Sequence, residues 1–92
     1  MLIKWTASAE EDFTQALSYL LEQGEEQAAQ TLASRLLRAI DRLAMFPHSG
    51  RPGHLPGSRE LVVPDLPYFA VYTVGQESVT IMRIIHTSRL WR

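Results

Sequence analysis

The sequence predicts one α+β domain with the element order β-α-α-β-β-β, in which a helical hairpin packs on a small antiparallel sheet. Two observations carry this prediction. Two consecutive segments of the first half place apolar residues at helical spacing, and the second half holds short β-branched and aromatic runs between turn residues. A chain of 92 residues supports one small core, so residues 1–92 are expected to form a single domain.

The first strand and the first helix are expected at the start of the chain. Leu2-Ile3-Lys4-Trp5 is short and apolar, which favours a strand. Ser8 is the expected helix N-cap, because Glu11 stands three residues later and completes a capping box. The carboxylates at positions 10–12 favour the positive end of the helix dipole, so we attribute them to this helix end and give them no catalytic role. Gly24 is the expected C-terminal cap.

A second helix is expected from about Glu25 to about Met45, where Pro47 stops it. Since neither apolar stripe would be stable alone in water, the two helices need a sheet to cover. The segment from Pro47 to Gly57 contains three prolines and three glycines, which predicts a series of turns and neither helix nor strand.

Three further strands are expected in the second half. They cover Arg59–Val63, Tyr68–Val74 and Ser78–His86, with a tight turn at Gly75-Gln76 and a tail over residues 87–92. Alternation along the middle strand places Tyr68 and Tyr72 on one face, where core packing explains them.

Composition excludes several classes of protein. The chain has no cysteine, and no uninterrupted apolar stretch approaches the roughly 18 residues that span a bilayer. No export signal is recognised at the start, so a cytoplasmic protein without membrane association is expected. Residues 1–50 hold four basic and seven acidic residues, a charge of −3, whereas residues 51–92 hold five and three, a charge of +2. Eight of the nine basic residues are arginine, which directs the search for a recognition surface to the second half.

Four segments in this order resemble the ParE/RelE toxin family, the plasmid-stabilisation toxins of type II toxin–antitoxin modules. The opening strand and helix entry are Trp5–Asp12, and the Pro-x-x-Gly-Arg motif lies in Phe46–Gly53. Arg59–Leu61 followed by Tyr68–Tyr72 resembles the family's central hairpin, and Ile81–Trp91 resembles its closing strand and tail. The resemblance spans nearly the whole chain and implies a helical hairpin on a small sheet.

The resemblance implies one of two activities. RelE-like members cleave messenger RNA on the ribosome and often carry an arginine in the central strand, where this chain has Phe69. Those ribonucleases are usually strongly basic, whereas the formal net charge here is −1. ParE-like members bind DNA gyrase and need no catalytic residues of their own. We therefore favour a ParE-like toxin that inhibits gyrase and is neutralised by a cognate antitoxin. The alternatives are a RelE-like endonuclease acting on ribosome and mRNA, and a non-toxic interaction domain.

The candidate site residues follow from both readings. Target-binding candidates are Arg51, Arg59, Arg83, Arg89 and Trp91, because arginine and large aromatic residues dominate protein recognition. If the chain is a ribonuclease, the candidates for catalysis are Arg83, His86 and Arg89.

Structural roles compete with these assignments. Arg59 and Arg83 could pair with Glu60, Glu77 or helix carboxylates instead of a target, and His86 could be structural. In a regular strand Arg83 and His86 lie on opposite faces unless a bulge intervenes. His48 and His54 match no metal motif, so no metal and no cofactor is expected. A homodimer or a toxin–antitoxin hetero-oligomer is expected.

Overall fold

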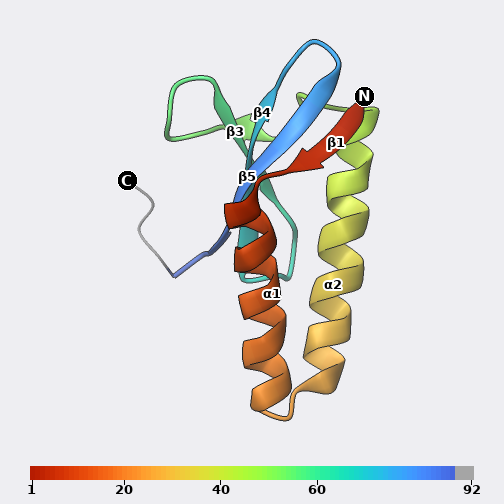
Figure 1. Ribbon diagram of the computed structural model, residues 1–92, viewed down its shortest axis with the longest axis vertical. Coiled ribbons are helices and arrows are strands. Elements are labelled where there is room, and N and C mark those ends of the chain that lie inside the picture. The colour runs from red at the N-terminus through yellow and green to blue at the C-terminus, as the bar shows by residue number, and fades with distance from the viewer. Residues whose placement is uncertain (89–92) are drawn as a thin grey trace.

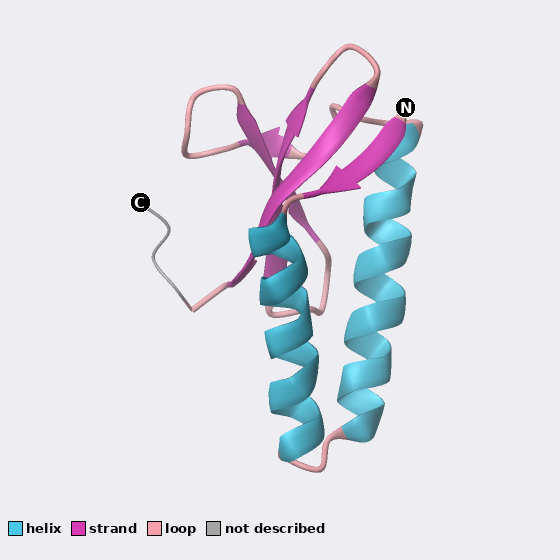
Figure 2. Cartoon of the chain, viewed as in Figure 1, coloured by secondary structure: helices cyan, strands magenta, loops and turns pink. Residues whose placement is uncertain are grey.

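The computed structural model describes residues 1–88 and confirms the α+β class (Figure 1). Two antiparallel helices stand beside one sheet, and their far ends extend well past it (Figure 2). Among the described residues, no helix has the length and apolar character needed to cross a membrane. In chain order the elements are β1 (Leu2–Trp5), α1 (Ala7–Glu22), α2 (Glu26–Asp41), the 3-10 helix η1 (Arg42–Ala44), β2 (Arg51–Pro52), β3 (Ser58–Val62), β4 (Tyr68–Val74) and β5 (Ser78–His86).

The sheet has five strands in the order β1-β5-β4-β3-β2 and differs from the prediction in two respects. β1 pairs with β5 in parallel, so the sheet is mixed and not purely antiparallel. β2, a two-residue strand inside the segment predicted to be turns only, pairs with β3. Side-chain alternation predicts which residues are strands but does not encode which strand lies beside which, and a two-residue strand is too short to alternate.

The start of α1 corrects the predicted capping box. The N-cap is Thr6, whose hydroxyl accepts the Ala9 N–H at 3.1 Å, and Ser8 lies inside the first turn. The residue three places after Thr6 is alanine, so Glu11 completes no capping box. A tertiary contact favours Thr6 over Ser8 as the N-cap. The Thr6 N–H donates to the Ile81 carbonyl at 3.0 Å, which ties the start of the helix to β5.

The hairpin turn agrees with the prediction. Gly24 has φ +74°, a left-handed conformation that glycine adopts without a steric penalty, and the Glu25 N–H returns to the Leu20 carbonyl at 2.8 Å. The second helix is regular to Asp41 and then tightens into η1, which ends before Met45.

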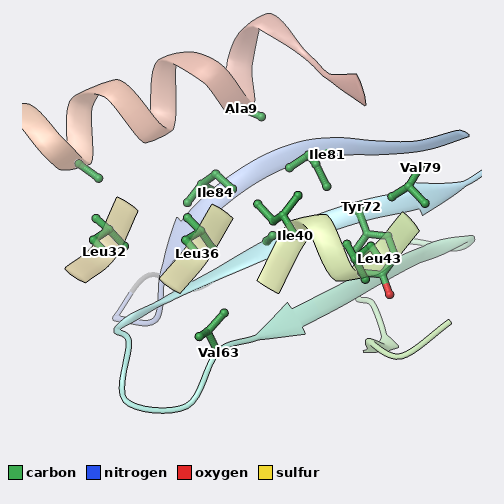
Figure 3. Close-up of a cluster of buried hydrophobic side chains, with 12 residues drawn as sticks. Ala9, Leu32, Leu36, Ile40, Leu43, Val63, Tyr72, Val79, Ile81 and Ile84 are labelled. Carbon is green, nitrogen blue, oxygen red and sulfur yellow. The ribbon is translucent and has the colours of Figure 1, made fainter. Parts of the chain in front are cut away.

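The core lies between the helical hairpin and one face of the sheet. In Figure 3 the labelled side chains of α2 and η1 meet those of β4 and β5. Tyr72 is fully buried there and Tyr68 packs at the edge of the same cluster, which confirms that the two tyrosines share the core face. A register shift between Val71 and Tyr72 leaves Met82 of β5 without a partner in β4. The bulge therefore precedes Arg83 and does not lie between Arg83 and His86.

Candidate functional site

Beyond the end of β1, the backbone of β5 has no neighbouring strand on that side among the described residues. β1 pairs with β5 only as far as Ile81, so the remainder of β5 needs other partners on that side. The start of α1 supplies them. The Thr6 hydroxyl donates to the Met82 carbonyl at 2.8 Å, and the Asp12 carboxylate accepts the Ile84 N–H at 3.0 Å. Polar groups of a helix thus satisfy the backbone of a strand edge.

Arg83 is bound to the same carboxylate by two hydrogen bonds. Its Nε donates to Asp12 Oδ2 at 2.7 Å and its Nη2 to Oδ1 at 3.1 Å. The Arg83 side chain is 34% exposed and that of Asp12 only 15%. Hydrogen bonding of its guanidinium to the Asp12 carboxylate, which accepts, raises the pKa of Arg83 above its ordinary value. Burial opposes the rise, and the negative charges of Asp12 and Glu11 reinforce it. Arg83 is therefore a fixed cation in a structural pair, as the competing reading allowed.

His86 sits at the end of β5 on the opposite side of the strand from Arg83. Its ring meets the Tyr68 ring edge-on, with centroids 5.0 Å apart and an interplanar angle of 85°. Nδ1 accepts the Ser88 N–H at 3.1 Å and lies 2.7 Å from Ser88 Oγ. A backbone N–H that donates to Nδ1 is compatible only with the tautomer that carries its proton on Nε2.

The two described candidates for catalysis have different surroundings. Arg83 is in register with Val71, and His86 with Tyr68 three residues away on β4, so alternation places them on opposite faces. The guanidinium of Arg83 turns to a helix carboxylate, whereas the ring of His86 meets that of Tyr68 edge-on at the rim of the core. The third candidate, Arg89, lies outside the described residues.

Arg59 holds the segment that carries the Pro-x-x-Gly-Arg motif. Its Nη1 donates to the Gly50 carbonyl at 2.7 Å and to the His48 carbonyl at 3.3 Å. From the core side, the Tyr72 hydroxyl accepts the Gly50 N–H at 2.9 Å and donates to the Pro47 carbonyl at 2.8 Å. A Cβ on Gly50 would lie 2.6 Å from the Tyr72 hydroxyl, so the motif requires glycine for close approach.

The helix-free face is the side of the sheet turned away from the hairpin, and its residues are Arg51, Glu60, Val62, Phe69, Val71, Arg83 and Ile85. The guanidinium of Arg83 turns from this face to Asp12 at the edge of the sheet. Phe69, Val71 and Ile85 form a second, smaller apolar cluster, beside which Val62 is 46% exposed. Arg51 Nη2 lies 2.8 Å from Glu60 Oε1, with 60% of the arginine side chain exposed and 10% of the glutamate's. This face thus combines an apolar centre with an accessible guanidinium at its rim.

Several of these roles escape sequence reasoning. Asp12 looks like one more acid in a helix start, yet it binds both Arg83 and the edge of β5. Glu60 follows Arg59 and precedes Leu61, and nothing in this order shows that its carboxylate is buried and paired with Arg51. His48 and His54 are exposed, and the described part of the chain brings no three metal-binding side chains together. Trp91 lies outside the described residues.

Comparison with known proteins gives consistent results. Residues 3–91 match the family described as "ParE toxin of type II toxin-antitoxin system, parDE". The chain is 35% identical over 89 residues to toxin Y4kP of Sinorhizobium fredii, covering 97% of this chain and 91% of that protein. It is 39% identical over 88 residues to toxin RelE2 of Caulobacter vibrioides, covering 96% and 97%. A solved structure of the chromosomal ParDE toxin–antitoxin system from P. aeruginosa has a similar fold, with a TM-score of 0.82 at 24% identity over 94% of this chain and 95% of that one.

Proposed function

This chain belongs to the ParE family of toxins of type II toxin–antitoxin systems, and from that premise we propose that it inhibits DNA gyrase by binding it. Phe69 is the observation that carries the proposal. The family resemblance places an arginine there in many ribonuclease members, whereas this phenylalanine is 7% exposed and packs with Val71 and Ile85. An apolar ring cannot stabilise charge at a scissile phosphate, but it can support a binding surface.

The helix-free face is the surface that we assign to the target. Its apolar cluster is largely buried and supports the face from beneath, whereas Val62 beside the cluster and the guanidinium of Arg51 at the rim are exposed and available to a target. Arg59 and Arg83 contribute indirectly, because one fixes the segment that carries Arg51 and the other fixes β5. This division sorts the three described arginines among the predicted target-binding residues into one contact residue and two positioning residues, and Arg89 lies outside the described residues.

Purified gyrase tests this assignment. The expected result is loss of supercoiling or accumulation of cleaved DNA when the protein is added in stoichiometric excess. Val62→Glu places a charge beside the apolar cluster of the helix-free face and is expected to abolish the effect. Leu37→Glu makes the same chemical change on α2, where the side chain is 39% exposed, and is expected to leave inhibition intact. No effect of the unchanged protein on gyrase would reject the proposal.

A second candidate function is the ribosome-dependent cleavage of messenger RNA. The relative named RelE2 favours it, as does the position of His86 in the lining of a small cavity. Cleaved transcripts in translating ribosomes, lost in His86→Ala, would select this function over gyrase inhibition. Normal growth on overexpression without an antitoxin would instead indicate an interaction domain that has lost toxicity.

An antitoxin is the expected protein partner. The similar P. aeruginosa structure is of a ParDE toxin–antitoxin system, which supports a neutralising partner for this chain. Since gyrase works in the cytoplasm, the proposal places the protein there. Co-expression with the neighbouring reading frame is expected to restore growth and to give a stable complex on purification.

A further inference from the structure

Three arginines form a row along α2 and the first residue of η1. Arg35, Arg38 and Arg42 follow one another at steps of three and four residues, the spacing that places side chains on one face of a helix. All three are exposed, and they line a cavity of about 300 Å³ between α2 and the connection from β3 to β4. We call these three residues the arginine row.

The arginine row has little counter-charge. Arg35 lies 3.9 Å from Asp65, and both side chains are largely exposed, so their attraction is weak. Within residues 1–88, Arg38 and Arg42 form no ion pair and donate no side-chain hydrogen bond. The helix dipole favours cations at the end of α2, which accounts for Arg38 and Arg42 but not for Arg35, six residues before that end. The helix dipole therefore explains only part of the row.

The charge of the chain is divided along the hairpin. Residues 35–59 contain five arginines and one carboxylate, a charge of +4, so the rest of the chain carries −5. Glu22, Glu25 and Glu26 lie at the turn between the helices, at the opposite end of the hairpin from the arginine row (Figure 1). The rise of the helix places Arg38 about 18 Å from Glu26 along α2. A polyanion is therefore attracted to the arginine row and repelled by the other end of the hairpin.

We propose that the arginine row binds the phosphate backbone of duplex DNA. The row spans about 10.5 Å along the helix, which corresponds to about three phosphates of one strand at about 3.4 Å of duplex axis each. Guanidinium groups bind phosphate through paired hydrogen bonds, and such contacts position a protein on DNA without reading its sequence. The choice of DNA rests on the proposed inhibition of gyrase, because gyrase acts on DNA.

An acidic protein segment fits the arginine row less well than DNA does. The apolar residues that line the cavity are few and small, namely Ala39, Val63 and Pro64, whereas a protein interface has a well-packed apolar or aromatic centre. Interfaces with DNA are more polar and more positively charged. A single phosphate is also a poor match, because guanidinium groups spread over about two turns of helix match a series of charges better than one charge.

An NMR titration of the full-length, ¹⁵N-labelled protein with a short duplex DNA, in the absence of gyrase, tests the proposal. The side-chain Nε–H signals of Arg35, Arg38 and Arg42 are expected to shift. Three phosphate contacts predict that the affinity falls about 40-fold between about 50 and about 200 mM salt. Absence of these shifts, or an affinity that does not depend on salt, would overturn the proposal. Tighter binding of a glutamate-rich peptide, or of double-stranded RNA of equal length, would assign the row to that partner instead.

Arg38→Gln and Lys4→Gln provide a matched pair of variants. Each removes one exposed cation, but Lys4 lies on β1, an edge strand that does not line the cavity. Arg38→Gln removes one phosphate contact, so the same increase in salt is expected to weaken its binding only about 12-fold, whereas Lys4→Gln is expected to keep the dependence of about 40-fold. Equal salt dependence of the two variants would refute the row. Urea unfolding of both variants checks that they fold.

Gyrase assays separate this proposal from gyrase inhibition. DNA binding at the arginine row by a protein that leaves gyrase active would reject gyrase inhibition and retain the row. Inhibition of gyrase without any shift of the arginine signals on addition of DNA would reject the row and retain gyrase inhibition.

Discussion

Replacement of Asp12 by alanine is expected to lower the free energy of unfolding by about 2–3 kcal/mol. The carboxylate accepts two hydrogen bonds from Arg83 and one from the Ile84 N–H. Breaking a fully buried ion pair costs about 3–5 kcal/mol, and a stranded buried N–H adds about 1–3 kcal/mol. Since the Arg83 side chain is 34% exposed, water recovers part of the loss, and the expected cost falls below the sum of these figures.

Urea denaturation measures this loss. With a slope of about 1 kcal/mol per molar urea for so small a domain, the midpoint is expected to fall by about 2–3 M without a change in slope. Glu10→Gln changes an exposed acid of the same helical turn and is expected to stay within about 0.5 kcal/mol of the unchanged protein. A loss below about 0.5 kcal/mol in Asp12→Ala would refute the structural role of the pair.

The contribution of Arg83 to stability depends on pH with a definite sign. Because folding raises the pKa of Arg83 above its ordinary value, the stabilisation from the pair is complete below that ordinary pKa and is lost only as pH rises through the higher pKa of the folded state. The coupling energy between Asp12 and Arg83 in a double-mutant cycle is therefore expected to be constant from pH 7 to pH 10. A coupling that declines across this interval would show that the arginine is not held as described.

Three further substitutions test the local structure by the same unfolding measurement. Thr6→Ala is expected to lower the free energy of unfolding by about 1–2 kcal/mol and Ser8→Ala to leave it almost unchanged, because only the former removes the N-cap. A larger loss in Ser8→Ala than in Thr6→Ala would instead support the capping box of Ser8 and Glu11. Tyr72→Phe is expected to cost about 1–3 kcal/mol by leaving the buried N–H of Gly50 unpaired, and an unchanged midpoint would refute that contact. Gly50→Ala forces a Cβ to within 2.6 Å of the Tyr72 hydroxyl and is expected to cost about 1–3 kcal/mol more than Gly75→Ala, whose nearest neighbour is at 3.4 Å; equal costs would contradict the close approach.

The sequence predicts the helices and long strands well because each carries its own periodic pattern. The stripe of α2 and the alternation of Tyr68, Ala70 and Tyr72 are local signals, and the structure places these residues in one core. The turn at Gly24 follows from a local requirement for positive φ. Such features depend on residues a few positions apart, so a single sequence contains the information.

The errors arise where a distant residue decides. Threonine and serine are both favourable N-cap residues, so Thr6 and Ser8 cannot be distinguished locally. Thr6 is the N-cap because it donates hydrogen bonds to the carbonyls of Ile81 and Met82. The parallel pairing of β1 depends on the whole path of the chain. The role of Asp12 depends on β1 ending at Trp5, which exposes the Ile84 N–H to a helix 72 residues earlier in the sequence. Spacing along the chain holds no signal for any of these contacts.

The two faces of the sheet use alternate residues of the same strands. Tyr68 and His86 lie on the core side, whereas their neighbours Phe69 and Ile85 belong to the helix-free face. The thickness of one sheet therefore separates His86, the candidate for catalysis, from the surface proposed to bind gyrase. Substitutions on one face leave the other face unchanged, so the two candidate functions can be tested separately in the same protein.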